Sequence, residues 1–134
     1  MRLFLFFSLL TITLWAADFT NIGARELQSL VNEGHPVIDI RTQPEWQETG
    51  IVQGSHPVTF FDTQGNYNPQ LFMLQISQYV TDKNQPFALI CRTGSRSKLV
   101  ADWLGKMGYT KVYNVQWGIL DWKKKGYPTV PYRP

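Results

Sequence analysis

The fold is decided by residues 87–97, which read Phe-Ala-Leu-Ile-Cys-Arg-Thr-Gly-Ser-Arg-Ser. Four apolar residues in succession are typical of a central parallel strand that is buried on both faces. A turn of small and polar residues follows, and Val100, Trp103 and Leu104 then recur at helical spacing. A strand, a short turn and a helix in this order favour a parallel sheet covered by helices.

The remaining chain alternates between strand and helix patterns on both sides of this stretch. We expect strands at 37–40, 54–58 and 112–115, and helices capped by Asn21 and starting at Pro44, Pro69 and Trp117. The helix after Gly94 has a predicted apolar stripe of Leu99, Val100, Trp103, Leu104 and Met107. The sequence therefore predicts one α/β domain over about residues 18–134, with a mostly parallel sheet and helices on both faces.

Residues 59–69 are rich in turn formers and are predicted to be a loop. The loop also contains Phe60, Phe61 and Tyr67. Two interpretations of these aromatic residues stay open: they can pack the loop onto the body, or they can rim a site or dock a partner.

Length and charge limit the function classes. The 134 residues suit one domain, and the net charge of +3 is compatible with attraction for small anions. No basic helix is interleaved with stacking aromatic residues, so we do not expect nucleic-acid binding. One cysteine and two scattered histidines predict no metal site, and no glycine-rich nucleotide loop is present, so we expect no cofactor.

The N-terminus has the layout of a secretory signal peptide. Arg2 precedes an apolar stretch from Leu3 that ends at Ala16-Ala17, just before the first acidic residue. We predict that residues 1–16 are cleaved, with cleavage after Ala17 as the alternative. An uncleaved membrane anchor is disfavoured because the stretch is shorter than the ~20 residues that a spanning helix needs. The protein would then be exported without stable membrane insertion, to the periplasm of a Gram-negative bacterium or otherwise into the medium.

Cys91 is the only cysteine, and its surroundings suggest a reactive thiolate. A short loop between a strand and a helix turns backbone N–H groups inward and forms an anion-binding nest. Gly94 permits the turn, Arg92 and Arg96 add positive potential, and Ser95 and Ser97 offer hydroxyl groups. We predict that Cys91 is the nucleophile and that residues 92–97, Thr93 included, bind the substrate.

At this point the sequence resembles the rhodanese family over nearly all of residues 18–134. Val37 to Arg41 followed by Pro44-Glu45-Trp46 is similar to its Asp-x-Arg box, and residues 91–97 are similar to its active-site loop. Further similarities lie at Gly50-Ile51 with Gly54-Ser55, at Gly108-Tyr109 with Val112, at Trp117-Gly118-Ile119 with Trp122, and at Gly126-Tyr127-Pro128. The sequence departs from the family in lacking a histidine beside Gly50 and in having Trp117 where the first glycine of a Gly-Gly pair is usual.

The resemblance implies a single rhodanese-like domain with a five-stranded sheet and sulfurtransferase activity. Cys91 would take the outer sulfur of a small anionic donor such as thiosulfate, hold it as a persulfide, and pass it to cyanide, a thiol or a protein acceptor. In this hypothesis Arg92 and Arg96 orient the donor. Asp39 and Arg41 either shape the site or brace neighbouring loops.

Three alternatives remain. A cysteine phosphatase or arsenate reductase has five residues between its cysteine and arginine, whereas four separate Cys91 from Arg96. The second alternative is a non-catalytic binding or sulfur-carrier module of the same fold. Binding modules of this kind typically lose the cysteine, whereas this chain keeps Cys91 and the other loop residues. A redox protein would need a partner thiol, because the chain has no second cysteine.

Overall fold

The computed structural model describes residues 18–134, and the predicted signal peptide lies outside them. Five strands form one sheet in the order β1-β6-β5-β2-β4, and every neighbouring pair is parallel. Their bounds are Thr20–Ile22 (β1), Val37–Asp39 (β2), His56–Pro57 (β4), Phe87–Ile90 (β5) and Val112–Val115 (β6). Two more strands, Ile51–Val52 (β3) and Thr129–Val130 (β7), pair antiparallel in a separate small sheet.

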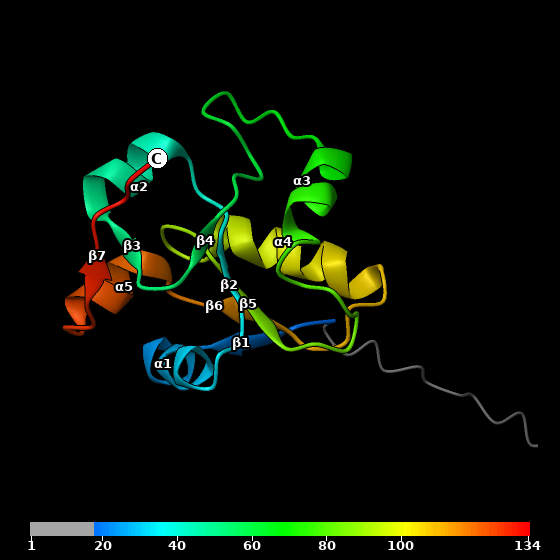
Figure 1. Ribbon diagram of the computed structural model, residues 1–134, viewed down its shortest axis with the longest axis horizontal. Coiled ribbons are helices and arrows are strands. Elements are labelled where there is room, and N and C mark those ends of the chain that lie inside the picture. Colours follow the sequence, from blue (N-terminus) through cyan, green and yellow to red (C-terminus); the bar gives the residue numbers. More distant parts are fainter. Residues whose placement is uncertain (1–17) are drawn as a thin grey trace, which may run out of the picture.

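Five helices accompany the strands (Figure 1), and their bounds are Ala24–Asn32 (α1), Gln43–Thr49 (α2), Pro69–Ile76 (α3), Ser95–Lys106 (α4) and Gly118–Lys124 (α5). The predicted α/β fold with a five-stranded parallel sheet is therefore confirmed. No helix among residues 18–134 has the length and apolar character needed to cross a membrane.

The central strand β5 explains how the sheet acquires two covered faces. Its four residues are all buried, and successive side chains point to opposite faces. Phe87 and Leu89 belong to the core that contains residues of α3 and α4, whereas Ala88 and Ile90 belong to the core that contains residues of α1 and α5. The uninterrupted apolar run is thus required by a strand with a core on each side.

The first strand was not predicted. Asn21 was expected to cap a helix, but it lies in β1, opposite Asn114 of β6, and Gly23 is the N-cap of α1. Thr20 and Asn21 are exposed and only Ile22 is buried, so these three residues carry no alternating apolar pattern. The strand exists because β6 offers an unpaired edge, which is a tertiary effect.

Burial corrects one further prediction and answers the question left open for the loop 59–69. Leu99 and Met107 were placed on the apolar stripe of α4, but both are exposed, whereas Val100 and Leu104 are buried. In the loop 59–69, Phe60 is buried and Tyr67 is exposed, with their rings stacked at a centroid distance of 5.7 Å. Phe60 and Tyr67 also line a cavity of about 530 Å³, so the loop both packs on the body and rims a hollow.

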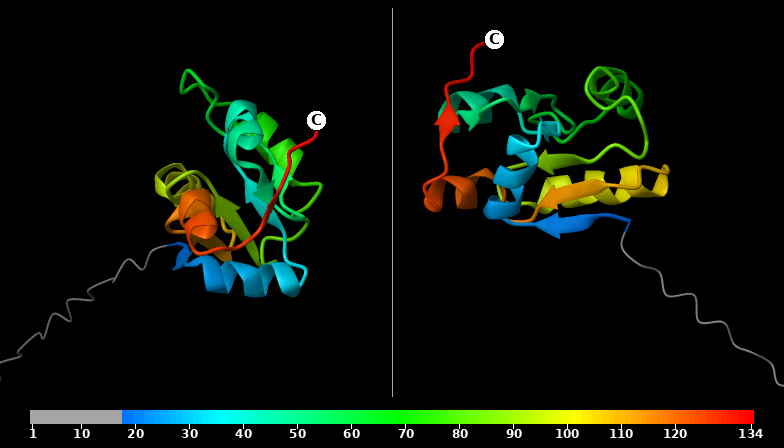
Figure 2. Two further views of the ribbon diagram at one scale, coloured as in Figure 1. Left: turned by 90° about the vertical axis from the view of Figure 1, so that its left-hand side faces the viewer. Right: turned by 60° about the horizontal axis from the view of Figure 1, so that its bottom comes forward.

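The C-terminal segment closes back over α2. β7 pairs with β3, and the Tyr132 ring lies 5.2 Å from that of Trp46 in α2. Figure 2 shows this last segment rising from α5 toward α2. Because α2 follows directly after the end of β2, it lies at the carboxyl end of the parallel sheet, where the cysteine loop also lies.

Candidate active site

Cys91 directly follows β5, the middle strand of the sheet. Asp39 at the end of the adjacent strand β2 is in register with Ile90. The carboxyl ends of parallel strands form the usual ligand-binding edge of an open α/β sheet. The sequence prediction that Cys91 lies at this edge agrees with the structure.

The loop wraps its backbone around the Cys91 sulfur. The N–H of Gly94 donates to Sγ at 3.1 Å, the N–H of Ser97 donates to it at 3.4 Å, and the Ser97 hydroxyl lies 3.2 Å away. The two N–H groups are donors that stabilise a negative charge on the sulfur, whether on a thiolate or on an added sulfur atom. The sulfur itself is fully buried.

Glycine is required at the turn of this loop. Gly94 has a φ of 96°, and a Cβ built on it would lie 1.9 Å from the Gln116 carbonyl oxygen. On the other side of the loop, the carbonyls of Cys91 and Arg92 accept from the N–H groups of Ile119 and Leu120 in α5. Because the first two loop carbonyls face α5, the following N–H groups are free to face the sulfur.

A chain of side chains reaches the sulfur from the far edge of the sheet. Ser97 contacts the Oδ1 atom of the buried Asn114 at 2.5 Å, and Asn114 Nδ2 donates to Asn21 Oδ1 at 2.9 Å. Sequence reasoning found Ser97 but missed Asn114 and Asn21. A polar residue inside the otherwise apolar strand 112–115 was the available signal, because a buried amide needs partners.

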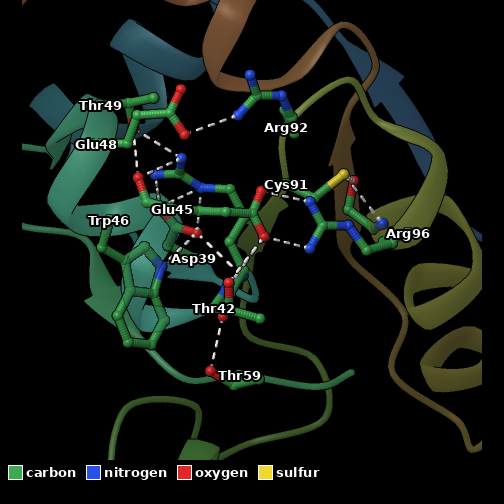
Figure 3. Close-up of polar contacts among 12 residues, drawn as sticks. Asp39, Thr42, Glu45, Trp46, Glu48, Thr49, Thr59, Cys91, Arg92 and Arg96 are labelled. Atoms are coloured by element: carbon green, nitrogen blue, oxygen red, sulfur yellow. Dashed lines mark hydrogen bonds and ion pairs between the residues drawn. The ribbon is translucent and has the colours of Figure 1, made fainter. Parts of the chain in front are cut away.

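Both arginines of the loop face glutamates of α2 (Figure 3). The Arg96 guanidinium donates two hydrogen bonds to the Glu45 carboxylate, at 2.8 and 2.7 Å, and Arg92 contacts Glu48 at 3.4 Å. The paired guanidinium lowers the pKa of Glu45 to about 2, and Glu45 in turn raises the pKa of Arg96. The role of Arg92 and Arg96 in orienting a donor stays a prediction, and the glutamates opposite them were not predicted.

Asp39 and Arg41 form a buried ion pair. Arg41 donates to both Asp39 carboxylate oxygens, with Nη2 2.8 Å from Oδ2, and both side chains are fully buried. Asp39 also accepts from the Trp46 indole, and Arg41 also donates to the Gly50 carbonyl. These contacts join β2 to the middle and the C-terminal end of α2, so the pair braces the helix that carries Glu45 and Glu48.

The remaining predicted site residues face outward. Thr93 and Ser95 are exposed, and their side chains make no hydrogen bond within residues 18–134. Across the same residues, no three His, Cys, Asp or Glu side chains are grouped so as to hold a metal ion.

Comparisons with known proteins show which family and fold the chain is similar to. The family model for the rhodanese-like domain matches residues 23–125. The thiosulfate sulfurtransferase GlpE of Actinobacillus pleuropneumoniae is 30% identical over 112 residues, which cover 82% of this chain and 92% of that protein.

Two solved structures match over 84% of this chain, each with a TM-score of 0.63. A rhodanese-related protein of Thermoplasma volcanium is 24% identical and covered over 99% of its length. A Rhodopseudomonas palustris protein of unknown function, called a possible tyrosine phosphatase, is 23% identical and covered over 85%. At these identities the structural likeness concerns the fold.

Proposed function

Because the chain belongs to the rhodanese-like family, we propose that it is a sulfurtransferase that carries sulfane sulfur on Cys91 as a persulfide. The observation that carries the proposal is the convergence of two backbone N–H groups on Sγ, at 3.1 and 3.4 Å. A thiolate in this nest is a nucleophile, and the persulfide that it forms is also an anion.

The proposed reaction has two steps that return the enzyme to its starting state. The Cys91 thiolate attacks the outer sulfur of a donor such as thiosulfate, a new S–S bond forms, and sulfite leaves with the electron pair of the broken bond. A nucleophilic acceptor, cyanide in an assay or a thiol in a cell, then attacks the outer sulfur and regenerates the thiolate. Since the donor product leaves before the acceptor reacts, double-displacement kinetics are expected.

Burial of the sulfur adds one requirement to this mechanism. Cys91 is fully buried, so a side chain beside it has to move before a donor reaches Sγ. We propose that Arg96 is the side chain that moves, because it is only partly buried and lies in the same loop as Cys91.

Intact mass measurement tests the proposal directly. The protein is incubated with excess thiosulfate, desalted and weighed, alongside the Cys91→Ser variant. We expect a gain of one sulfur atom that cyanide removes as thiocyanate, and no gain in the variant. No gain, together with thiosulfate:cyanide transfer at background, would leave the non-catalytic module of the same fold.

The phosphatase alternative is tested on the same samples. Four residues separate Cys91 from Arg96, and Arg96 is already held by Glu45. Both features favour sulfur over a phosphate group, since a phosphate would need both the space and a free guanidinium. Turnover of an aryl phosphate that is lost in Cys91→Ser would reverse this preference.

A further inference from the structure

We propose that Glu45 is a specificity-determining residue that selects against doubly charged sulfur donors and in favour of donors with one negative charge. This inference rests on the proposed function and names the donors that the site prefers, namely singly charged organic thiosulfonates and persulfides, which should react faster than a dianion such as thiosulfate.

The balance of charge around the loop is the first part of the argument. The loop and the first turn of α4 supply two cations, Arg92 and Arg96, and α2 supplies two anions, Glu48 and Glu45, each paired with one of them. The rim that a donor meets is therefore neutral, although the loop sequence taken alone is strongly positive. A dianion gains no net attraction from a rim of this kind.

The two pairs are not equivalent. Arg96 and Glu45 make two short hydrogen bonds, and 28% and 18% of their side-chain surfaces are exposed. Arg92 and Glu48 make one contact of 3.4 Å, with 39% and 61% exposed. Solvent weakens the second pair, so Glu45 is the carboxylate that decides whether a loop arginine is available to a donor.

Glu45 is itself held in place by its own helix. Its Oε1 atom accepts from the Thr42 hydroxyl at 3.1 Å and from the Thr42 N–H at 3.4 Å, which is the capping box of α2. The carboxylate is thus positioned before any donor arrives, and a donor has to displace it from Arg96. An incoming dianion also meets the Glu45 charge itself, and the repulsion grows with each negative charge on the donor.

The variant Glu45→Gln separates charge from structure, because glutamine preserves the capping box while removing the negative charge. Persulfide formation is followed by rapid quench and intact mass, with thiosulfate (two charges) and ethanethiosulfonate (one charge) as donors. Each transfers its outer sulfur to Cys91, and sulfite or ethanesulfinate leaves with the electron pair. The matched control is Glu48→Gln, which frees the more exposed arginine of the same loop.

We expect Glu45→Gln to raise kcat/KM for thiosulfate about tenfold, the scale of one charge-assisted hydrogen bond, and for ethanethiosulfonate about threefold. Glu48→Gln should change either value by less than about twofold. An unchanged ratio between the two donors in Glu45→Gln would overturn the inference. Thermal unfolding of both variants establishes that they are folded.

Alkylation of Cys91 keeps this test independent of sulfur transfer. The rate with iodoacetate, which is an anion, is divided by the rate with neutral iodoacetamide, and Glu45→Gln should raise this ratio several-fold. If neither donor yields a persulfide in any variant, the proposed function fails, while the alkylation ratio still decides the role of Glu45. An unchanged alkylation ratio would refute that role even in an active enzyme.

Discussion

The buried pair of Asp39 and Arg41 supplies the sharpest prediction about stability. Replacing Asp39 with asparagine keeps the side-chain size but removes the charge that faces the fully buried guanidinium. It also puts an amide NH2 group where a carboxylate oxygen accepts hydrogen bonds from Arg41 at 2.8 to 3.3 Å. We expect the free energy of unfolding to fall by about 3–5 kcal/mol, the usual cost of breaking a buried ion pair.

A loss of this size is a large part of the total stability. A single domain has about 5–15 kcal/mol, and in one of this length each 1 kcal/mol lowers Tm by about 3–6 °C. Asp39→Asn should therefore melt about 10–25 °C below the unchanged protein. Urea unfolding followed by tryptophan fluorescence measures the free energy, and Trp46 reports locally because its indole donates to Asp39 at 3.0 Å.

The control is Asp102→Asn, which breaks an exposed pair with Lys106 one helical turn away. That change should leave the free energy of unfolding unchanged within the error of the urea measurement, because solvent screens an exposed pair. A loss below about 1 kcal/mol in Asp39→Asn would refute the reasoning, since it would mean that the guanidinium does not depend on this carboxylate. Persulfide formation by the folded fraction of Asp39→Asn then distinguishes two roles of Asp39. An unchanged rate indicates that Asp39 only braces α2, and a lowered rate indicates a direct role at the site.

Three further predictions concern the loop and its supports. Gly94→Ala should abolish persulfide formation and lower the free energy of unfolding by more than about 2 kcal/mol, because its Cβ would lie 1.9 Å from a carbonyl oxygen. The control Gly34→Ala has nothing within 4 Å of its Cβ, so it should lower the free energy of unfolding only by the ~1–2 kcal/mol of its left-handed backbone. Asn114→Ala should lower the urea-derived free energy of unfolding by about 1–3 kcal/mol through loss of a buried hydrogen-bond partner, and a loss below 0.5 kcal/mol would contradict this. The pKa of Glu45 is lowered from 4.5 to about 2, so its ion pair with Arg96 stabilises the fold fully above about pH 4.5. This contribution is about 1–2 kcal/mol after solvent screening, and it is lost as the pH falls toward 2. Acid unfolding of Glu45→Gln should lack that component, and identical acid midpoints would count against it.

Local sequence determined the central part of this protein. The pattern of neighbouring residues already reflects burial on both sheet faces and a tight turn. It consists of the four apolar residues of β5, the glycine three positions after Cys91, and Val100 and Leu104 of α4. For the same reason the position of Cys91 at a strand end could be predicted. Such features depend on spacing within about ten residues, which the sequence displays directly.

Tertiary structure alone decided which charges and amides meet. Glu45 and Arg96 are 51 residues apart, Asn21 and Asn114 are 93 apart, and each becomes a partner only when the sheet order is established. The sequence by itself therefore presented two arginines beside Cys91 as an anion-binding surface, whereas the fold pairs both with carboxylates of α2. The physical reason is that a side chain's charge belongs to the sequence, but its electrostatic effect depends on distance and burial, which the packing of distant segments determines.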